Sequence, residues 1–360
     1  SYRHASWPRC RAWKYCTWWF WWLIILSRSN ISKFLAFLVG LVCIFLAYNY
    51  NQKNNHIYQG EIYGTYWKIS SKEFINQQYI DQIKNILNDI DMIASNYKPS
   101  SEVNKLNSLD INQEFFLSDD LYEIFKTAFE VSNNTSGIYD ITIGSVVNNL
   151  GFGPNLFIDK EYVFEPYTLK LSLNDENKSI TKLKDTTIDL SSIAKGYAVD
   201  AVSNYLLSKN FNNYLVDIGG EIAANGTSKQ GNWIIGIQDP QSIQQKVYFT
   251  ISNSDKFIAV ATSGDYLNFK YIGDRLVTHT IDPRIKESKI NNVLSVTVVD
   301  EYSATKADAY ATAFNVMSLE ESIELSDSLN IKLKIIYLNN GIIDIFESKS
   351  WQNQNQTSTA

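Results

Sequence analysis

The chain has 360 residues, of which 45% are hydrophobic and 19% charged, a composition typical of a globular protein and not of a disordered one. Residues 1–60 contain seven Lys or Arg and no Asp or Glu, so the remaining residues have 25 basic and 38 acidic side chains and a net charge of −13. An acidic body argues against nucleic acid as the main partner and is compatible with a divalent cation.

Cysteine and histidine are scarce in this sequence. All three cysteines lie before residue 50, so the rest of the chain has no disulfide, no thiolate metal site and no cysteine nucleophile. His279 is the only histidine after residue 60. This excludes a histidine-rich zinc site and makes any imidazole chemistry depend on one residue.

The N-terminal part combines a Trp-rich stretch with an apolar run. Residues 1–30 contain six of the nine Trp, and we assign this segment no role. The run from Phe34 to Tyr48 follows Lys33, so residues 31–48 are predicted to form a membrane anchor or signal segment. The preceding basic residues predict that the body lies on the periplasmic or extracytoplasmic side of the inner (cytoplasmic) membrane. The alternatives are a cleaved signal peptide and a buried core helix.

Residues 58–347 are predicted to form a single α+β domain, preceded by a linker at residues 49–57 and followed by a polar tail at residues 348–360. Ser118 followed by two acids predicts a helix start. Helices are predicted near residues 73–95, 118–133, 192–209, 304–317 and 320–328. Strands are predicted near 61–69, 168–173, 186–190, 213–217, 233–238, 246–251, 257–262, 275–281, 293–299, 331–338 and 341–347.

Four segments place glycines, small polar residues and carboxylates at chain turns. They are Thr135–Asp140, Asp189–Asp200, Leu215–Glu221, and the set formed by Ala261–Asp265, Thr278–Arg284 and Ala304–Thr312. Each feature alone has a plain reading as a turn, a solvated helix face or a structural histidine.

Two of these segments suggest phosphate and metal chemistry. Between Asp189 and Lys195 a strand runs into a helix start, where free backbone amides can receive phosphate oxygens and the lysine adds positive charge. Asp308 and Thr312 lie four residues apart on a predicted helix, so their oxygens face one side. A carboxylate and a hydroxyl, completed by carbonyls, phosphate and water, form a reasonable Mg²⁺ site.

Together the four segments resemble the ApbE-like FAD:protein FMN transferases, from Gly64–Thr65 to Asp308–Thr312. The resemblance implies Mg²⁺-dependent transfer of FMN from FAD to a Thr or Ser hydroxyl of an acceptor protein, with release of AMP. It also implies an acceptor that belongs to a membrane or extracytoplasmic electron-transfer system. An FAD pyrophosphatase, a tethered FAD-binding protein without turnover and an anchored structural domain are the alternatives.

The resemblance also assigns roles to individual residues. It predicts a cofactor-binding set made of Tyr97, Ile138, Tyr139, Asp140, Asp189, Lys195, Thr262, Ser263 and Gly264. It predicts a metal site made of Asp308, Thr312 and the backbone carbonyl of Ser192. Removal of the acceptor's proton requires a base, and His279 is predicted to be this base or to position the acceptor, with Asp282 three residues on.

Overall fold

The computed structural model describes residues 28–154, 161–242, 246–264, 269–272, 275–289 and 291–357. The chain divides into two units at Asn54, and each is described by itself. The Trp-rich residues 1–27 and Asp265 of the fourth motif segment lie outside the described residues.

The first unit contains helix α2 (Arg28–Lys53). Its large apolar side chains are exposed, including those of Phe34, Phe37, Leu41 and Phe45. Among the described residues, no helix combines the length and the hydropathy required to cross a membrane. The polar composition predicts a linker over residues 49–57, whereas α2 continues through Lys53 and β1 begins at His56.

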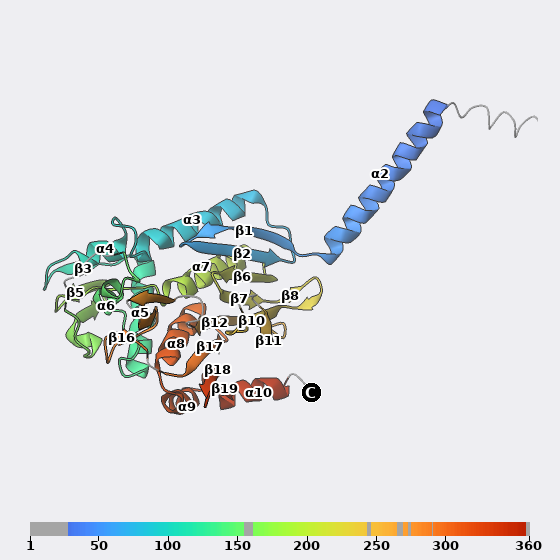
Figure 1. Ribbon diagram of the computed structural model, residues 1–360. Coiled ribbons are helices and arrows are strands. Elements are labelled where there is room, and N and C mark those ends of the chain that lie inside the picture. Colours follow the sequence, from blue (N-terminus) through green and yellow to red (C-terminus); the bar gives the residue numbers. More distant parts are fainter. Residues whose placement is uncertain are drawn as a thin grey trace, which may run out of the picture. The chain divides into compact units, whose positions relative to one another are not determined.

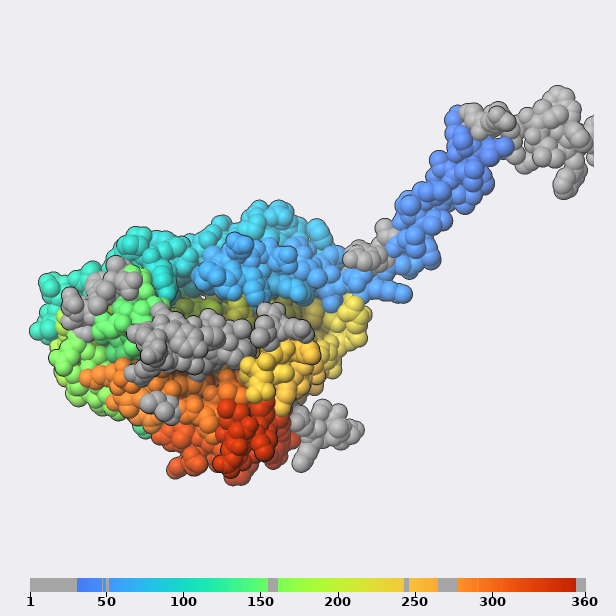
Figure 2. All heavy atoms as spheres, in the orientation of Figure 1, coloured from blue at the N-terminus to red at the C-terminus, as the bar shows by residue number. Residues whose placement is uncertain are grey.

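An eight-stranded sheet with antiparallel neighbours organises the second unit (Figure 1). Its order is β1 (His56–Ile62), β2 (Thr65–Ser71), β6 (Tyr214–Ile218), β7 (Glu221–Asn225), β12 (Ile258–Gly264), β17 (Val293–Asp300), β18 (Lys332–Asn339) and β19 (Ile342–Glu347). In Figure 2 the blue and cyan segments that include β1, β2 and α3 lie along one side of this unit, and the orange and red C-terminal segments lie along the other.

Both faces of the sheet are covered, because successive side chains of a strand point to opposite faces. In β12, Ala259 and Ala261 belong to the larger apolar core, whereas Ile258 and Val260 belong to a second one. The larger core lies under four helices, α3 (Gln77–Ala94), α5 (Asp119–Asn134), α7 (Ala194–Ser208) and α8 (Ala304–Val316). The second core lies under the hairpin of β10 (Ile234–Gln238) and β11 (Val247–Ser252) and under α10 (Lys349–Thr357).

Short elements complete the second unit. They are α4 (Glu102–Asn107), β3 (Glu114–Phe116), α6 (Gly144–Asn149), the 3₁₀ helix η2 (Tyr167–Leu169), β4 (Leu171–Asn174), β5 (Ser179–Lys182), β8 (Thr227–Ser228), β9 (Gly231–Asn232), β13 (Phe269–Ile272), β14 (Arg275–Thr278), β15 (Ile281–Asp282), β16 (Glu287–Ser288) and α9 (Leu319–Ser328).

The α+β class and most predicted elements are confirmed to within a few residues. Ser118 caps α5 as predicted, since its Oγ accepts a hydrogen bond from the backbone N–H of Leu121. The strand predicted at 186–190 is wrong, because this segment makes only an isolated bridge between Thr187 and Ile143. The tail predicted from residue 348 instead begins with α10, since the buried indole of Trp351 packs on the second core.

Helices α7 and α8 approach each other closely at Gly196. A Cβ on this residue would lie 2.4 Å from the carbonyl oxygen of Ala304 and 2.8 Å from Cβ of Asp308. We therefore expect Gly196→Ala to push the two helices apart and to reduce the free energy of unfolding by about 1–3 kcal/mol. Urea unfolding measures this loss. Gly341→Ala is the control for backbone strain without a steric clash, because a Cβ there meets nothing within 4 Å while the φ of +83° is unfavourable for alanine. Equal stability of Gly196→Ala and the wild type would contradict the close packing.

Candidate functional site

The predicted metal residues lie where α7 crosses α8. The carboxylate of Asp308 is buried, and its Oδ2 accepts a hydrogen bond of 2.9 Å from the backbone N–H of Gly196. This amide belongs to the first turn of α7, where the helix dipole favours negative charge. Thr312 lies one turn further along α8 and is partly buried. Their spacing of four residues on α8 places both side chains on one side of the helix, and their role as metal ligands stays a prediction.

Lys195 and Glu221 form an ion pair beside this carboxylate. The Nζ of Lys195 lies 2.6 Å from Oε1 of Glu221, the first residue of β7. The other carboxylate oxygen of Glu221 is buried and has no hydrogen-bond partner. Sequence reasoning included Glu221 in a glycine-rich motif segment but assigned it no role. Only the antiparallel turn between β6 and β7 brings it against Lys195.

The charges of this cluster act on one another. The pKa of Asp308 is raised to about 8, first by burial and next by the charge of Glu221, while the charge of Lys195 opposes both. Burial would lower the pKa of Lys195, but the charges of Glu221 and Asp308 outweigh it, so the pKa is raised. Burial also raises the pKa of Glu221 against the opposing charge of Lys195. One lysine thus faces two buried carboxylates, and an additional cation would stabilise their charged forms.

Tyr139 lies between the segment that precedes α7 and three aspartates. Its hydroxyl lies 3.0 Å from Oγ of Ser192, the residue whose carbonyl is predicted to bind metal. Burial raises the pKa of this phenol, and the charges of Asp308, Asp189 and Asp140 raise it as well. Tyr139 therefore stays neutral and lies close to three predicted site residues.

Two asparagines hold the segment that leads into α7. Asn96 donates to the carbonyl of Ile188 (2.7 Å) and accepts from the N–H of Leu190 (3.2 Å). Asn107 donates to the same carbonyl and accepts from the N–H of Ile188. Asp189 is consequently fixed in a buried position, where burial raises its pKa despite a hydrogen bond from the N–H of Ser191. These side-chain clamps take the place of the strand that the sequence predicts at 186–190.

Tyr97 and His279 lie near a common neighbour, Phe152. Tyr97 is 65% exposed, and its hydroxyl donates to the carbonyl oxygen of Phe152 at 2.7 Å. The rings of His279 and Phe152 meet edge to face with centroids 6.5 Å apart. The exposed ring of Tyr97 is suited to stack on a planar ligand, and His279 shares with it the neighbour Phe152.

Asp140 lies in a buried ionic cluster. Its Oδ1 accepts from the backbone N–H and the hydroxyl of Thr142, and its Oδ2 accepts from Tyr162 (2.6 Å) and from Nζ of Lys170 (2.9 Å). The Lys170 ammonium also lies 4.2 Å from the centre of the Tyr162 ring. Asp140 thus fixes the loop after Tyr139, and the prediction that it lines the FAD pocket stays a prediction.

The remaining predicted residues are held by hydrogen bonds to neighbouring segments. Thr262 pairs with Thr297 of β17 through their hydroxyls (3.1 Å), and Oγ of Ser263 accepts from the side chain of Asn315 (3.0 Å). Gly264 ends β12, and Ile138 packs against the larger core. The carboxylate of Asp282 accepts from Nε and Nη2 of Arg284, so its oxygens are engaged by a guanidinium.

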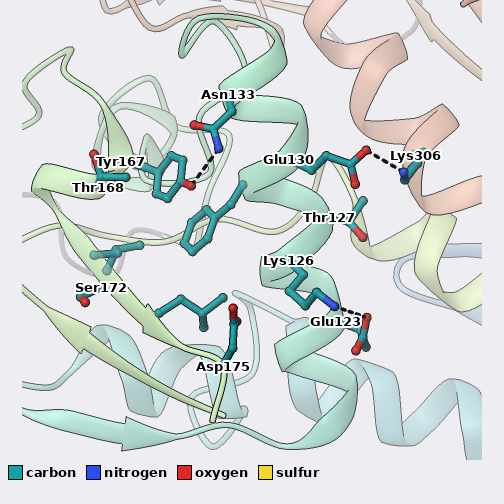
Figure 3. A pocket seen from close by; sticks show the side chains of 13 residues that line it. Glu123, Lys126, Thr127, Glu130, Asn133, Tyr167, Thr168, Ser172, Asp175 and Lys306 are labelled. Atoms are coloured by element: carbon teal, nitrogen blue, oxygen red, sulfur yellow. Dashed lines mark hydrogen bonds and ion pairs between the residues drawn. The ribbon is translucent and has the colours of Figure 1, made fainter. Parts of the chain in front are cut away.

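A cavity of about 660 Å³ lies elsewhere, between α5 and the strand β4 (Figure 3). Phe129 and Tyr167 stack at its wall with centroids 3.9 Å apart, and Lys306 pairs with Glu130 at 2.6 Å. None of the predicted FAD or metal residues lines it. Its cations are already paired with acids, so it does not provide the free positive charge that a pyrophosphate requires.

Across the described residues, no cluster of three or more His, Cys, Asp or Glu side chains is arranged to hold a metal ion. The set at α7 and α8 is of another kind: one carboxylate, one hydroxyl and one backbone carbonyl. Such oxygen ligands suit Mg²⁺, which usually keeps several waters and binds through one or two carboxylates together with substrate phosphates.

Known proteins share this sequence and fold. Residues 63–336 match the ApbE family. The FAD:protein FMN transferases of Vibrio cholerae serotype O1 and Haemophilus influenzae are each 32% identical to the chain, covering 77% and 73% of it and 86% and 80% of their own lengths. The solved flavin transferase ApbE from Vibrio cholerae superposes with a TM-score of 0.70 at 28% identity, over 83% of this chain and 99% of its own. The chain belongs to the ApbE family.

Proposed function

We propose that the protein transfers FMN from FAD to a hydroxyl of an acceptor protein. In this reaction the acceptor oxygen forms a bond to the phosphorus of the FMN half, the bond from this phosphorus to the bridging oxygen breaks, and AMP leaves. The observation that carries the proposal is the junction of α7 and α8: Lys195 lies in the first turn of α7, Asp308 of α8 accepts from the N–H of Gly196 in that turn, and Thr312 follows one turn along α8. The names of the 32% identical relatives support the same activity.

Mg²⁺ is the metal that we assign to Asp308, Thr312 and the Ser192 carbonyl. The fit rests on the buried carboxylate of Asp308, which has Glu221 as a like-charged neighbour and only one lysine to balance the two. When bound, the ion would neutralise charge that grows on the phosphate oxygens. Retention of this donor set also disfavours a protein that only binds FAD, since such a protein has less need of a metal at the pyrophosphate.

The chain's own groups would align the nucleotide. The ammonium of Lys195 would supply positive charge to a pyrophosphate at the start of α7. The free helix-start amides that the sequence predicts are in part engaged, since the N–H of Ala194 donates to the carbonyl of Leu190 and that of Gly196 to Asp308. Glu221 keeps this ammonium in place through their contact of 2.6 Å. Tyr97 would stack on the flavin or the adenine through its exposed ring. Phosphoryl transfer requires mainly such alignment and charge stabilisation.

We assign to His279 the removal of the proton from the acceptor hydroxyl. We expect His279→Ala to reduce the rate of FMN transfer by about 10²–10⁴-fold without abolishing it, because alignment of the nucleotide is retained. The rate of flavinylated acceptor formation at saturating FAD measures the effect. His56→Ala is the matched control, since His56 lies in β1 and takes no part in the site. A His279→Ala variant that keeps the full rate would end this assignment.

We further propose that α2 attaches the protein to the inner membrane, with the catalytic domain on the extracytoplasmic side. The support is the exposed apolar surface along α2 and the basic residues that precede it. The acceptor would then be a membrane or extracytoplasmic electron-transfer protein with a Thr or Ser acceptor motif. Flotation of the full chain with vesicles, compared with a chain that lacks residues 1–54, tests the attachment. Equal flotation of both chains would contradict it.

Hydrolysis of FAD is the competing reaction, with water in place of the acceptor hydroxyl. The same residues would serve both, so the products distinguish them. The full chain is incubated with FAD and Mg²⁺, with and without a protein that carries a Thr acceptor motif, and AMP and free FMN are quantified. A transferase gives AMP that depends on the acceptor and little free FMN. If AMP and free FMN form in the same amounts with and without the acceptor, the protein is a pyrophosphatase instead.

A further inference from the structure

Asn315 lies on the same side of α8 as the two proposed metal ligands. Asp308, Thr312 and Asn315 are spaced at i, i+4 and i+7, which places them along one stripe of the helix. The Asn315 side chain is fully buried, although it carries two polar atoms. A buried amide is costly unless each polar atom is hydrogen-bonded.

Both polar atoms of this amide have partners from other segments. Its Nδ2 donates to Oγ of Ser263, at the end of β12, and to Oγ1 of Thr280, each at 3.0 Å. Its Oδ1 accepts from Nζ of Lys289, which also donates to the carbonyl of Val293 at 2.8 Å. Ser263 is a predicted FAD contact, and Thr280 is the chain neighbour of His279.

One side chain therefore connects three parts of the site. The helix contributes Asp308 and Thr312, β12 contributes the turn at Ser263, and the segment after β14 contributes His279. An apolar residue of similar size would fill the same volume without fixing these segments to each other. The two hydrogen bonds from a single rigid amide set the distance between Ser263 and Thr280.

The structure assigns to Asn315 the role of a positioning residue, which holds the His279 segment in register with the FAD-facing turn and the metal-binding face of α8. This role rests on the proposed function of His279. Asn315 would touch neither FAD nor acceptor, and it would act through Thr280 on the base and through Ser263 on the nucleotide.

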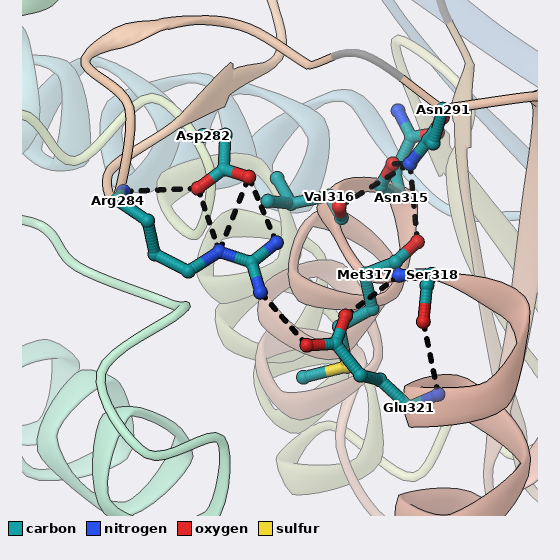
Figure 4. Close-up of polar contacts among 8 residues, drawn as sticks. All are labelled: Asp282, Arg284, Asn291, Asn315, Val316, Met317, Ser318 and Glu321. Atoms are coloured by element: carbon teal, nitrogen blue, oxygen red, sulfur yellow. Dashed lines mark hydrogen bonds and ion pairs between the residues drawn. The ribbon is translucent and has the colours of Figure 1, made fainter.

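A second attachment holds the same segment further along the chain (Figure 4). Arg284 pairs with Asp282 at 2.8 Å and reaches Glu321 at 2.8 Å, in the first turn of α9. Glu321 in turn accepts from the backbone N–H of Ser318 as part of a capping box. The segment that carries His279 is thus fixed to α8 by Asn315 and to α9 by Arg284, and Asp282 serves by orienting this arginine.

Asn291 provides a matched control for Asn315. Its Nδ2 lies against the last carbonyls of α8, those of Asn315, Val316 and Met317, at 3.0–3.2 Å (Figure 4). Asn291→Ala therefore removes hydrogen bonds from the same end of α8 but leaves the contacts to Ser263 and Thr280 in place. Any effect that arises only from loosening α8 would appear in both variants.

The experiment measures kcat and KM for FAD in Asn315→Leu, Asn291→Ala and Thr280→Val, each with and without His279→Ala. We expect Asn315→Leu to lower kcat about tenfold to a hundredfold, because a base displaced by about 1 Å loses rate on this scale. Loss of the contact to Ser263 would raise KM for FAD. Thr280→Val, which removes only one hydroxyl, would lower kcat and leave KM unchanged.

The combination with His279→Ala separates positioning from general damage. If Asn315 acts through His279, its substitution lowers kcat little further once the imidazole is absent. An equal loss of kcat in both backgrounds, or in Asn291→Ala, would overturn the inference, as would full kcat in Asn315→Leu. If Asn315→Leu does not fold, Thr280→Val decides by the same criterion. Full rate in His279→Ala alone would instead refute the proposed role of His279.

Discussion

Asp308→Asn is expected to lower FMN transfer by at least about a thousandfold and to leave the protein folded. Loss of the charge that we propose binds Mg²⁺ would remove several kcal/mol of stabilisation from the transition state, and each 1.36 kcal/mol corresponds to a factor of ten in rate. The amide oxygen of Asn can still accept the hydrogen bond from the N–H of Gly196. The rate of acceptor flavinylation and the temperature of unfolding measure the two effects.

Asp308→Asn is expected not to lower the free energy of unfolding. Asp308 is buried beside Glu221, and burial raises its pKa to about 8. At pH 9 the wild type without metal carries this buried carboxylate in its charged form, which lowers the free energy of unfolding. Asp308→Asn removes the charge, so the variant is expected to be no less stable than the wild type at this pH. Glu320→Gln is the control for a lost acid, since Glu320 is exposed in the first turn of α9. An Asp308→Asn variant within tenfold of the wild-type rate would contradict the metal assignment.

The second large effect is expected for Lys195→Met, a loss of about a hundredfold in kcat/KM for FAD. A methionine keeps the length of the side chain, but the positive charge at the start of α7 is lost, and Glu221 is left buried without its ion-pair partner. Hydrogen bonds to charged groups contribute about 1.5–3 kcal/mol, which corresponds to roughly tenfold to a hundredfold or more. Steady-state kinetics with varied FAD measures the change.

Glu221→Gln tests how much the position of the Lys195 ammonium contributes, apart from its charge. This variant keeps the ammonium and the volume of the side chain but removes the attraction that holds Lys195 at 2.6 Å from Glu221. We expect a smaller loss than for Lys195→Met. Lys126→Met is the control for a lost surface charge, since Lys126 forms an exposed ion pair with Glu123 and lies far from the proposed site, over the ring of Tyr122. A loss in Lys126→Met equal to that in Lys195→Met would exclude a local effect at α7.

Local signals explain why so much of the fold could be predicted from the sequence. Ser118 begins α5 because its hydroxyl satisfies a free amide, and this requires only neighbours in the chain. The pairing of Asp308 with Thr312 likewise follows from helical spacing alone. The β-branched residues that are concentrated in β17 and β18 favour strands, and both strands are confirmed.

Contacts between distant segments explain what the sequence did not reveal. Glu221 meets Lys195, and Asn315 meets Ser263 and Thr280, only after the sheet has formed and α7 and α8 have packed on it. The strand predicted at 186–190 fails because side-chain amides of Asn96 and Asn107, about 80 to 95 residues earlier, satisfy its backbone. In α10 a single buried tryptophan outweighs a polar composition.

The mass of the acceptor protein after denaturation tests the proposed activity most directly. The full chain in detergent is incubated with FAD, Mg²⁺ and a small protein that carries a Thr acceptor motif, and the acceptor is then unfolded and weighed. The proposed activity predicts a covalent FMN adduct that disappears with a chelator and with Asp308→Asn. An acceptor of unchanged mass, while FAD is bound intact or is converted to free FMN and AMP, would contradict the transferase.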